Sequence, residues 1–180
     1  MQTVTVSGSP ASTAPQERSF ASVAEQHLAD VHSYLLYFTG DRAVAEELTA
    51  ETFERACRHW RRYDPRRASA KTWLCQIARS TALDHFRAEE RRRRRETAYV
   101  RSEPVDTYED AFGEGLSPRL EEALRSLSAG EREVIALRVI LDIEVEGAAR
   151  LLGISGTACT TRLHRALARL EAKVGDDVVA

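Results

Sequence analysis

Residues 145–174 read VEGAARLLGISGTACTTRLHRALARLEAKV, a stretch with two helical patterns separated by a short turn. Apolar residues recur every three or four positions on both sides of Gly153-Ile154-Ser155, as they do on one face of a helix. We expect a short helix at Val145–Leu152 and a longer one from about Gly156 to Val174. A helix, a three-residue turn containing glycine and a second helix form the helix-turn-helix plan. Other pairs of packed helices share this plan, so it does not establish DNA binding by itself.

The longer of these two helices has a polar face beside its apolar face. Short hydroxyls, an imidazole and a guanidinium fall at helical spacing on it: Thr157, Thr160, Thr161, His164 and Arg165. Such side chains hydrogen-bond base edges or phosphates when a helix lies in a major groove. Ser155 is placed to cap the helix and to direct its N-terminus toward a phosphate. For this helix alone, a plain solvent-exposed face is the competing interpretation.

Three more helices are predicted in the first half of the chain. The first begins at Phe20 and ends at Thr39-Gly40, and Asp41 can cap a second that runs to about Trp60. A third follows the polar loop at residues 66–70 and continues into the arginine run at residues 91–95. Gly and Pro together make up only 14 of 180 residues, and helix-favouring residues dominate. The expected fold is all-α, and the inward residues of these helices include Leu28, Phe53, Cys57 and Trp73.

The helices group into two small domains. The first is expected at residues 18–95 and the second at residues 117–174. Between them, residues 96–116 are acidic, contain Pro and Gly and lack a helical period, which is typical of a flexible linker. Residues 1–17 have the composition of a disordered tail, and residues 175–180 form a second tail. A Ser-Pro helix start at the second domain and a capping-box pattern at Ser128 and Glu131 support this division.

Charge is strongly segregated although the net charge is only −2. Residues 54–101 contain 15 Arg and Lys against 6 Asp and Glu, whereas residues 102–122 contain 1 against 7. A basic block beside an acidic connector indicates a polyanionic partner, although an arginine run on an exposed helix is the simpler alternative.

The sequence gives no sign of enzymatic chemistry. It has no HExxH, no glycine-rich phosphate loop and no GxSxG, and its five histidines lie on separate helical turns. We therefore expect no active site, no metal and no cofactor. The three cysteines, Cys57, Cys75 and Cys159, are far apart and are expected to be buried free thiols. No secretion signal or membrane span is recognisable, so the cytoplasm is the expected compartment.

Two stretches resemble a known family. ELTAETFERACRHWRRYDPRRASAKTWLCQIARSTALDHFR (47–87) resembles region 2 of bacterial RNA polymerase sigma factors, and LSAGEREVIALRVILDIEVEGAARLLGISGTACTTRLHRALARL (127–170) resembles region 4. Their order and short connection are similar to the extracytoplasmic-function (ECF) group of the sigma-70 family. The resemblance covers residues 18–96 and 117–174. It implies a non-enzymatic factor that binds core RNA polymerase and directs promoter recognition and melting.

The resemblance also implies roles for individual residues. The segment that docks on the core polymerase corresponds to Glu47, Leu48, Glu51, Thr52 and Phe53. A loop at residues 63–70 corresponds to the one that captures a flipped base of the −10 element, where stacking and charge hold a separated strand. Expected contacts to the −10 element are Arg62, Tyr63, Arg66, Arg67, Lys71, Ser80, Asp84 and Arg87. Expected contacts to the −35 element are Ser155, Thr157, Thr160, Thr161, Arg162, His164 and Arg165.

Some positions depart from the family pattern. Ala68 and Ala70 replace a usual Gly and aromatic residue, Ser80 replaces Asn, and Thr160 replaces a basic residue. Gly147 replaces an acidic residue and weakens its helix by up to about 1 kcal/mol relative to Ala.

The family also implies an anti-sigma factor as a further partner. Two other interpretations remain open. One is a helix-turn-helix regulator that acts without core polymerase, and the other is an RNA-binding or nuclease-type enzyme that uses the arginine run.

Overall fold

The computed structural model describes residues 19–96, 112 and 116–175. Within these residues every regular element is a helix, which confirms the all-α prediction. In chain order the elements are α1 (Phe20–Thr39), α2 (Arg42–His59), the 3-10 turn η1 (Trp60–Arg62), α3 (Ala70–Glu96), α4 (Pro118–Arg125), α5 (Ala129–Ile135), the π-helix η2 (Ala136–Ile140), α6 (Val145–Leu152) and α7 (Gly156–Val174). We refer to α1–α3 with η1 as the first domain and to α4–α7 with η2 as the second domain.

The helix limits in the first domain follow from capping residues. The Ser19 hydroxyl accepts from the Ser22 amide, and the Asp41 carboxylate accepts from the Val44 amide. Gly40 has a φ of 70°, the left-handed conformation that ends α1 at little steric cost. These limits agree with the predicted ones, and α3 includes the arginine run as expected.

Two of the expected inward positions in this domain are wrong. Leu28 is 53% exposed on α1, and the Cys57 thiol is exposed on α2. Both lie at the edge of an apolar stripe, where a small error in helix phase turns a side chain outward. Phe53 and Trp73 are partly buried against the core. Cys75 and Cys159 are buried free thiols, so the cysteine prediction is correct for two of the three.

The second domain begins with the predicted Ser-Pro cap at α4 and the predicted capping box at α5. Beyond α5 the chain departs from an α-helix, because the Leu141 amide donates to the Ala136 carbonyl five residues back. Asp142 then adopts a φ of 49° and redirects the chain into α6. The predicted limits of α6 and α7 are confirmed, and Gly153 ends α6 with a φ of 68°.

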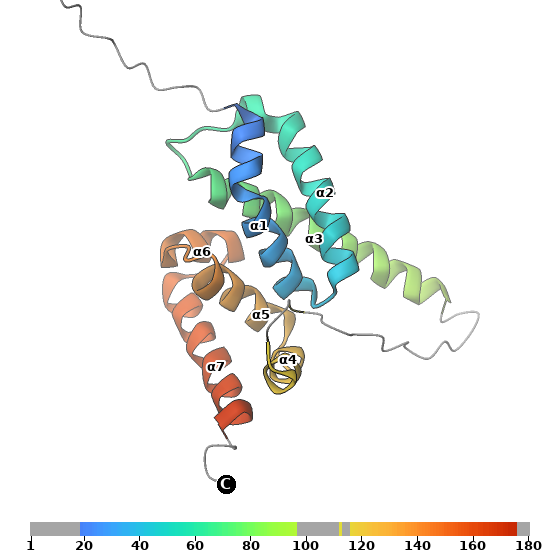
Figure 1. Ribbon diagram of the computed structural model, residues 1–180, viewed down its shortest axis with the longest axis vertical. Helices are drawn as coiled ribbons and strands as arrows, with labels where there is room; N and C mark the ends of the chain where they lie inside the picture. Colours follow the sequence, from blue (N-terminus) through green and yellow to red (C-terminus); the bar gives the residue numbers. More distant parts are fainter. Residues whose placement is uncertain (1–18, 97–111, 113–115, 176–180) are drawn as a thin grey trace, which may run out of the picture.

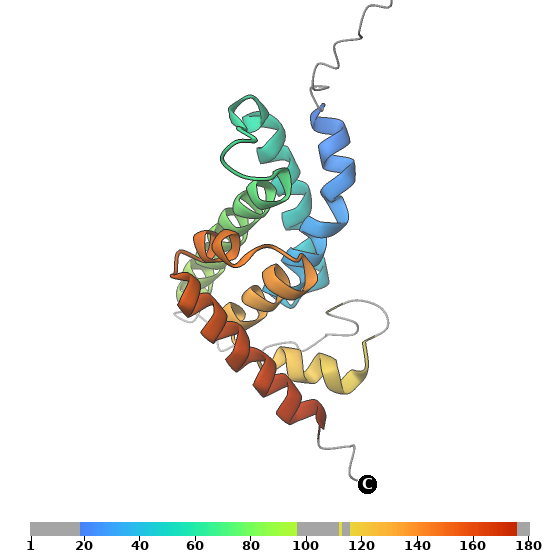
Figure 2. The same cartoon turned by 90° about the vertical axis from the view of Figure 1, so that its left-hand side faces the viewer.

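The two domains pack directly on one another. Figure 1 shows α5 against the lower end of α1 and α6 beside α3, and Figure 2 shows the same arrangement from the side. Buried residues of both domains belong to one apolar core, including Val31 and Leu35 from α1 and Leu137 from η2. The sequence suggested two domains separated by a linker, and it did not predict this interface.

Most of the predicted linker, the predicted N-terminal tail and residues 176–180 of the predicted C-terminal tail lie outside the described residues. Phe112 is one of the described residues of the linker: it is buried, and its ring centroid lies 5.7 Å from that of Tyr37 on α1. An apolar anchor therefore lies inside the segment predicted to be a flexible linker. No helix in the described part of the chain is both long enough and apolar enough to cross a membrane.

Candidate nucleic-acid interface

The first turn of α7 is held by its cap. The Ser155 hydroxyl accepts from the Ala158 amide at 3.1 Å, as predicted, so the helix begins at a fixed position. Thr157, Thr161 and Arg165 are exposed on the following turns, and Arg162 is half-buried. A rigid helix with short hydroxyls and two guanidiniums on one face has the chemistry that base edges and phosphates require.

A hollow of about 710 Å³ lies between this turn and the start of α5. Its lining residues are Ser128, Gly130, Glu131, Ser155, Thr157, Ala158, Thr161, Arg162, Arg165 and Arg169. The structure thus brings together five of the seven predicted −35 residues. The other two, Thr160 and His164, are exposed on the same helix but do not line the hollow. The Thr160 hydroxyl donates to the Gly156 carbonyl at 3.1 Å.

Arg169 belongs to this surface and was missed from the sequence. Its Nη1 donates to both carboxylate oxygens of Glu131, at 2.7 Å to Oε1 and at 2.9 Å to Oε2, and Oε2 also accepts from the Ser128 amide and hydroxyl. Burial would raise the pKa of the Glu131 carboxyl, but the Ser128 donors and Arg169 lower it below its ordinary value. The pair ties α7 to α5. Arg169 follows Arg165 by four residues, and extending the helical spacing by one turn would have identified it.

The predicted −10 loop, residues 63–70, ends one residue earlier because α3 begins at Ala70, and aromatic rings hold it in place. Trp60 and Tyr63 are stacked with centroids 5.1 Å apart, and Trp73 lies 5.1 Å from Tyr63. The Tyr63 hydroxyl donates to the Ala68 carbonyl at 3.2 Å and so closes the loop. Arg62, Arg66 and Arg67 are exposed beside it. Three guanidiniums therefore surround a loop that aromatic side chains hold in place.

The predicted −10 residues on α3 divide between two places. Ser80, Asp84 and Arg87 share one exposed face, where Asp84 accepts from Arg87 and from Arg55 of α2, each at 3.2 Å. Lys71 does not share that face. Its Nζ donates to the Leu141 carbonyl of the second domain and pairs with Asp30, each at 3.2 Å. In this arrangement Lys71 is therefore engaged in the domain interface.

The predicted polymerase-docking residues on α2 require a correction. Leu48 and Thr52 are buried in the core of the first domain, and the Thr52 hydroxyl donates to the Leu48 carbonyl at 2.6 Å. Their side chains cannot contact a partner on the surface because they face inward. Glu47 is exposed, Glu51 one turn along the same face is half-buried, and Phe53 is half-buried on another face, where it packs against the core. Only these three are available for docking.

The strongest pKa perturbations lie away from both candidate DNA surfaces. Burial, followed by the Glu133 charge, raises the pKa of Tyr34 well above its ordinary value, and burial also raises that of Glu133. Burial raises the pKa of the Cys75 thiol to about 12. Within the described residues no three His, Cys, Asp or Glu side chains are grouped as metal ligands would be.

Both domains are similar to known proteins. Residues 23–92 match Sigma-70 region 2, and residues 117–170 match Sigma-70 region 4. The chain is 30% identical over 166 residues to the ECF RNA polymerase sigma factor SigL of Mycobacterium tuberculosis, covering 92% of each. It is 32% identical over 162 residues to the ECF RNA polymerase sigma factor BldN of Streptomyces coelicolor, covering 88% of this chain but only 61% of BldN.

Solved structures show the same fold. The sigma factor RpoE of Bartonella quintana, solved with the anti-sigma factor NepR, superposes with a TM-score of 0.73 at 23% identity over 88% of this chain and 98% of that one. CnrH, solved with the cytosolic domain of CnrY, gives a TM-score of 0.62 at 22% identity, over 91% and 92%. The two region matches and the sequence relatives show that the chain belongs to the ECF group of the sigma-70 family, the sigma factors that direct transcription initiation.

Proposed function

We propose that this ECF sigma factor binds core RNA polymerase and recognises promoters with two separate surfaces. The observation that carries the proposal is the hollow at the start of α7, where the Ser155 cap, Arg162 and Arg165 converge beside exposed threonines. A capped helix terminus attracts phosphate, and the side chains of the next turn reach base edges when the helix enters a major groove. We assign this surface to the −35 element as duplex DNA.

We assign the loop at residues 63–69 and the exposed face of α3 to the −10 element as a separated strand. Aromatic rings and guanidiniums hold unpaired bases by stacking and charge. Extruding a base costs a few kcal/mol. A loop that is already ordered before DNA binds adds no ordering cost of its own to this free energy. The ring stack of Trp60, Tyr63 and Trp73 and the Tyr63–Ala68 hydrogen bond support this assignment.

Docking on the polymerase is assigned to the exposed edge of α2. Glu47, Glu51 and Phe53 offer two carboxylates and one apolar ring on adjacent turns. Leu48 and Thr52 support this edge from inside the core. Charge reversal at Glu51 combined with a polar residue at Phe53 is expected to abolish transcription, and normal binding of core polymerase by that variant would contradict the assignment.

The remaining partners follow from the family. RpoE and CnrH were solved with NepR and with CnrY, and we propose an anti-sigma partner for this chain as well. We also propose that it acts in the cytoplasm and contributes no catalytic group of its own, the chemistry being that of the polymerase. A helix-turn-helix regulator that acts without polymerase is not favoured, because residues 23–92 match region 2.

Transcription reconstituted from purified components tests the proposal. Core polymerase and a library of genomic fragments are incubated with and without the chain, and transcript 5′ ends are mapped by sequencing. Discrete start sites that require the chain and share upstream sequence elements would support the proposal. Identical transcripts with and without the chain would refute it.

A further inference from the structure

The exposed face of α3 carries a carboxylate on a surface that we assign to DNA. Asp84 is the one acidic side chain among the residues expected at the −10 element, and its side chain is 48% exposed. A phosphate backbone repels a carboxylate on the surface that it meets. Asp84 therefore opposes DNA binding unless its charge is compensated.

Two guanidiniums compensate this charge, one at each carboxylate oxygen. Asp84 Oδ2 accepts from Arg55 Nη1 and Oδ1 accepts from Arg87 Nη1, each at 3.2 Å. An ionised carboxylate can accept about four hydrogen bonds in all, so about half of its capacity is left for a donor on the DNA. Asp84 is thus neutralised and still able to accept.

The two arginines hold Asp84 to different extents. Arg87 lies three residues further along α3, and its side chain is 66% exposed. Arg55 reaches across from α2, its side chain is 32% exposed, and its Nη2 donates to Glu51 Oε1 at 2.5 Å. Burial lowers the pKa of Arg55, but its hydrogen bonds to Asp84 and Glu51 outweigh this and raise it. Because carboxylates hold Arg55 on two sides, it fixes the orientation of Asp84 more firmly than Arg87 does.

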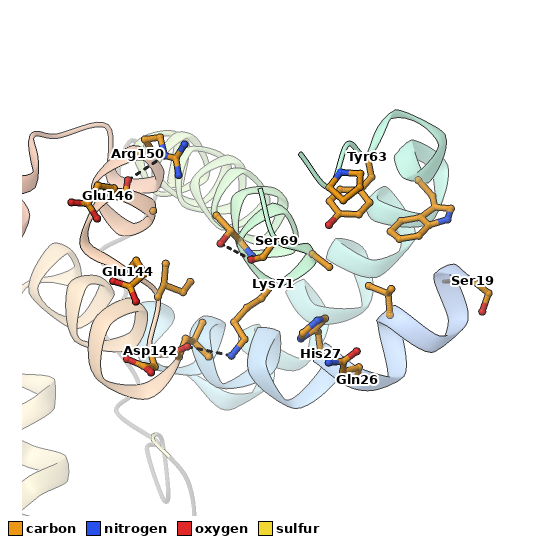
Figure 3. Close-up of a pocket in the computed structure, with 18 residues that line it drawn as sticks. Ser19, Gln26, His27, Tyr63, Ser69, Lys71, Asp142, Glu144, Glu146 and Arg150 are labelled. Carbon is orange, nitrogen blue, oxygen red and sulfur yellow. Dashed lines mark hydrogen bonds between the residues drawn. The ribbon is translucent and has the colours of Figure 1, made fainter. Parts of the chain in front are cut away.

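Lys71, at the start of α3, is directed away from this face. It lines a groove of about 1420 Å³ between the domains, and Figure 3 shows its ammonium directed toward the segment that contains Asp142. The α3 residues that remain for DNA contacts are Ser80, Asp84 and Arg87. A hydroxyl both donates and accepts and a guanidinium only donates, so Asp84 is the one pure acceptor among these three.

A carboxylate that is held in place selects bases by their donors. Adenine, cytosine and guanine each carry an exocyclic amino group, whereas thymine carries only carbonyl oxygens outside its ring, besides its methyl group. The edges of unpaired bases are open to such contacts. A carboxylate accepts from an amino group and is repelled by a carbonyl oxygen. Thymine is therefore the base that fits Asp84 least.

We propose that Arg55 is a positioning residue for promoter recognition. It holds Asp84 so that the carboxylate accepts from the amino group of one base of the −10 element and disfavours thymine at that position. The inference rests on the proposed function of the α3 face and adds a residue of α2 and a rule of base selection. Because Arg55 also pairs with Glu51, one side chain joins the docking edge of α2 to the DNA face of α3.

Base preference in the holoenzyme tests the proposal. One promoter found by the transcription experiment above is prepared as a pool with every single-base substitution in its −10 element, and transcripts are counted by sequencing. We expect one position at which thymine gives about tenfold fewer transcripts than the preferred base, and about twofold fewer or less with Asp84→Ala. A docking defect lowers transcription from all templates alike, so it does not change this ratio.

Variants of Arg55 separate positioning from direct contact. Arg55→Ala should lower the ratio to about threefold, because a carboxylate that is not held samples other rotamers. Arg55→Lys keeps the charge but not the forked donors, so it should recover part of the ratio. The double variant Arg55→Ala with Asp84→Ala should match Asp84→Ala alone, since Arg55 acts through Asp84. Arg58→Ala is the matched control, because Arg58 pairs with Glu54 of its own helix, and should keep the full ratio.

Circular dichroism melting checks that each variant is folded, and Arg55→Lys serves as the test if Arg55→Ala is not. An unchanged ratio in the Arg55 variant would overturn the proposal, as would a double variant that differs from Asp84→Ala. A thymine ratio that is absent from the unmodified chain, or that Asp84→Ala leaves intact, would overturn it too. In all these cases start sites still depend on the chain and the proposed function stands. If no start site depends on the chain, the proposed function itself fails.

Discussion

The two candidate DNA surfaces are built by different means. In the second domain the contacts are side chains on one face of α7, and the Ser155 cap fixes where that face begins. In the first domain they surround a loop that lies between helices and is held by stacked rings and by the Tyr63–Ala68 hydrogen bond. A rigid helix suits duplex DNA, whose groove has a constant shape. A loop supported by aromatic side chains suits single, unpaired nucleobases.

Removing an aromatic side chain that supports the loop is the change with the largest expected effect. Trp60 contacts the rings of Phe20, Tyr63 and Trp73, with centroid distances of 5.6, 5.1 and 5.9 Å. Trp60→Ala should therefore lower the free energy of unfolding by about 3 kcal/mol in urea titrations. The exposed neighbour serves as the control, because His59→Ala should change it by less than about 0.5 kcal/mol. Equal effects of both substitutions would mean that the rings do not hold the loop.

The corresponding test of the helical surface measures DNA binding. Arg165→Ala should weaken binding to duplex promoter DNA by about 1 to 3 kcal/mol if the side chain contacts a base, and the loss should depend on the −35 sequence. Gel-shift titrations of holoenzyme on matched and altered −35 sequences measure it. Arg125→Ala on α4, where Arg125 pairs with Glu121, is the matched control and should bind normally. A loss that is the same for every −35 sequence would assign Arg165 to the phosphate backbone.

Arg67 in the loop should act only after the strands separate. Arg67→Ala should leave closed-complex formation nearly intact and slow promoter opening, with an effect of about 1 kcal/mol. A template already mismatched over the −10 region should partly rescue it, because pre-melting supplies the unpairing energy. Permanganate footprints on both templates measure opening, and Arg94→Ala at the exposed end of α3 is the control. An equal defect on both templates would assign Arg67 another role.

Local signals in the sequence predicted the helices well. Ser19, Asp41, Ser117 and Ser128 each cap the helix that follows them, and such caps depend only on neighbouring residues. The face of α7 was predictable for the same reason. Leu48 and Thr52 were misplaced because a family motif identifies a segment without saying which of its side chains face the core.

The domain interface could not be predicted in this way. The Tyr34–Glu133 contact joins residues 99 positions apart, and no local pattern encodes it. Glu133 in particular reads as an ordinary charged residue on α5 and is buried only because Arg79 and Tyr34 meet it. The surroundings of Gly147 were not predictable either, because the sequence shows only that a glycine lowers the stability of α6.

Gly147 and Gly130 provide the smallest test, because both are helical glycines in the second domain but differ in surroundings. An alanine Cβ at Gly147 would lie 3.0 Å from Cγ2 of the buried Ile143, whereas at Gly130 the nearest atom is Arg162 Nη1 at 3.5 Å. Alanine gains about 0.8 to 1 kcal/mol of helix propensity over glycine. Gly130→Ala should therefore raise the free energy of unfolding by about 0.5 to 1 kcal/mol, while crowding cancels the gain at Gly147→Ala. Urea titrations of both variants decide the matter, and an equal gain at the two positions would show that Ile143 moves freely and that the α6 contact is looser than its geometry indicates.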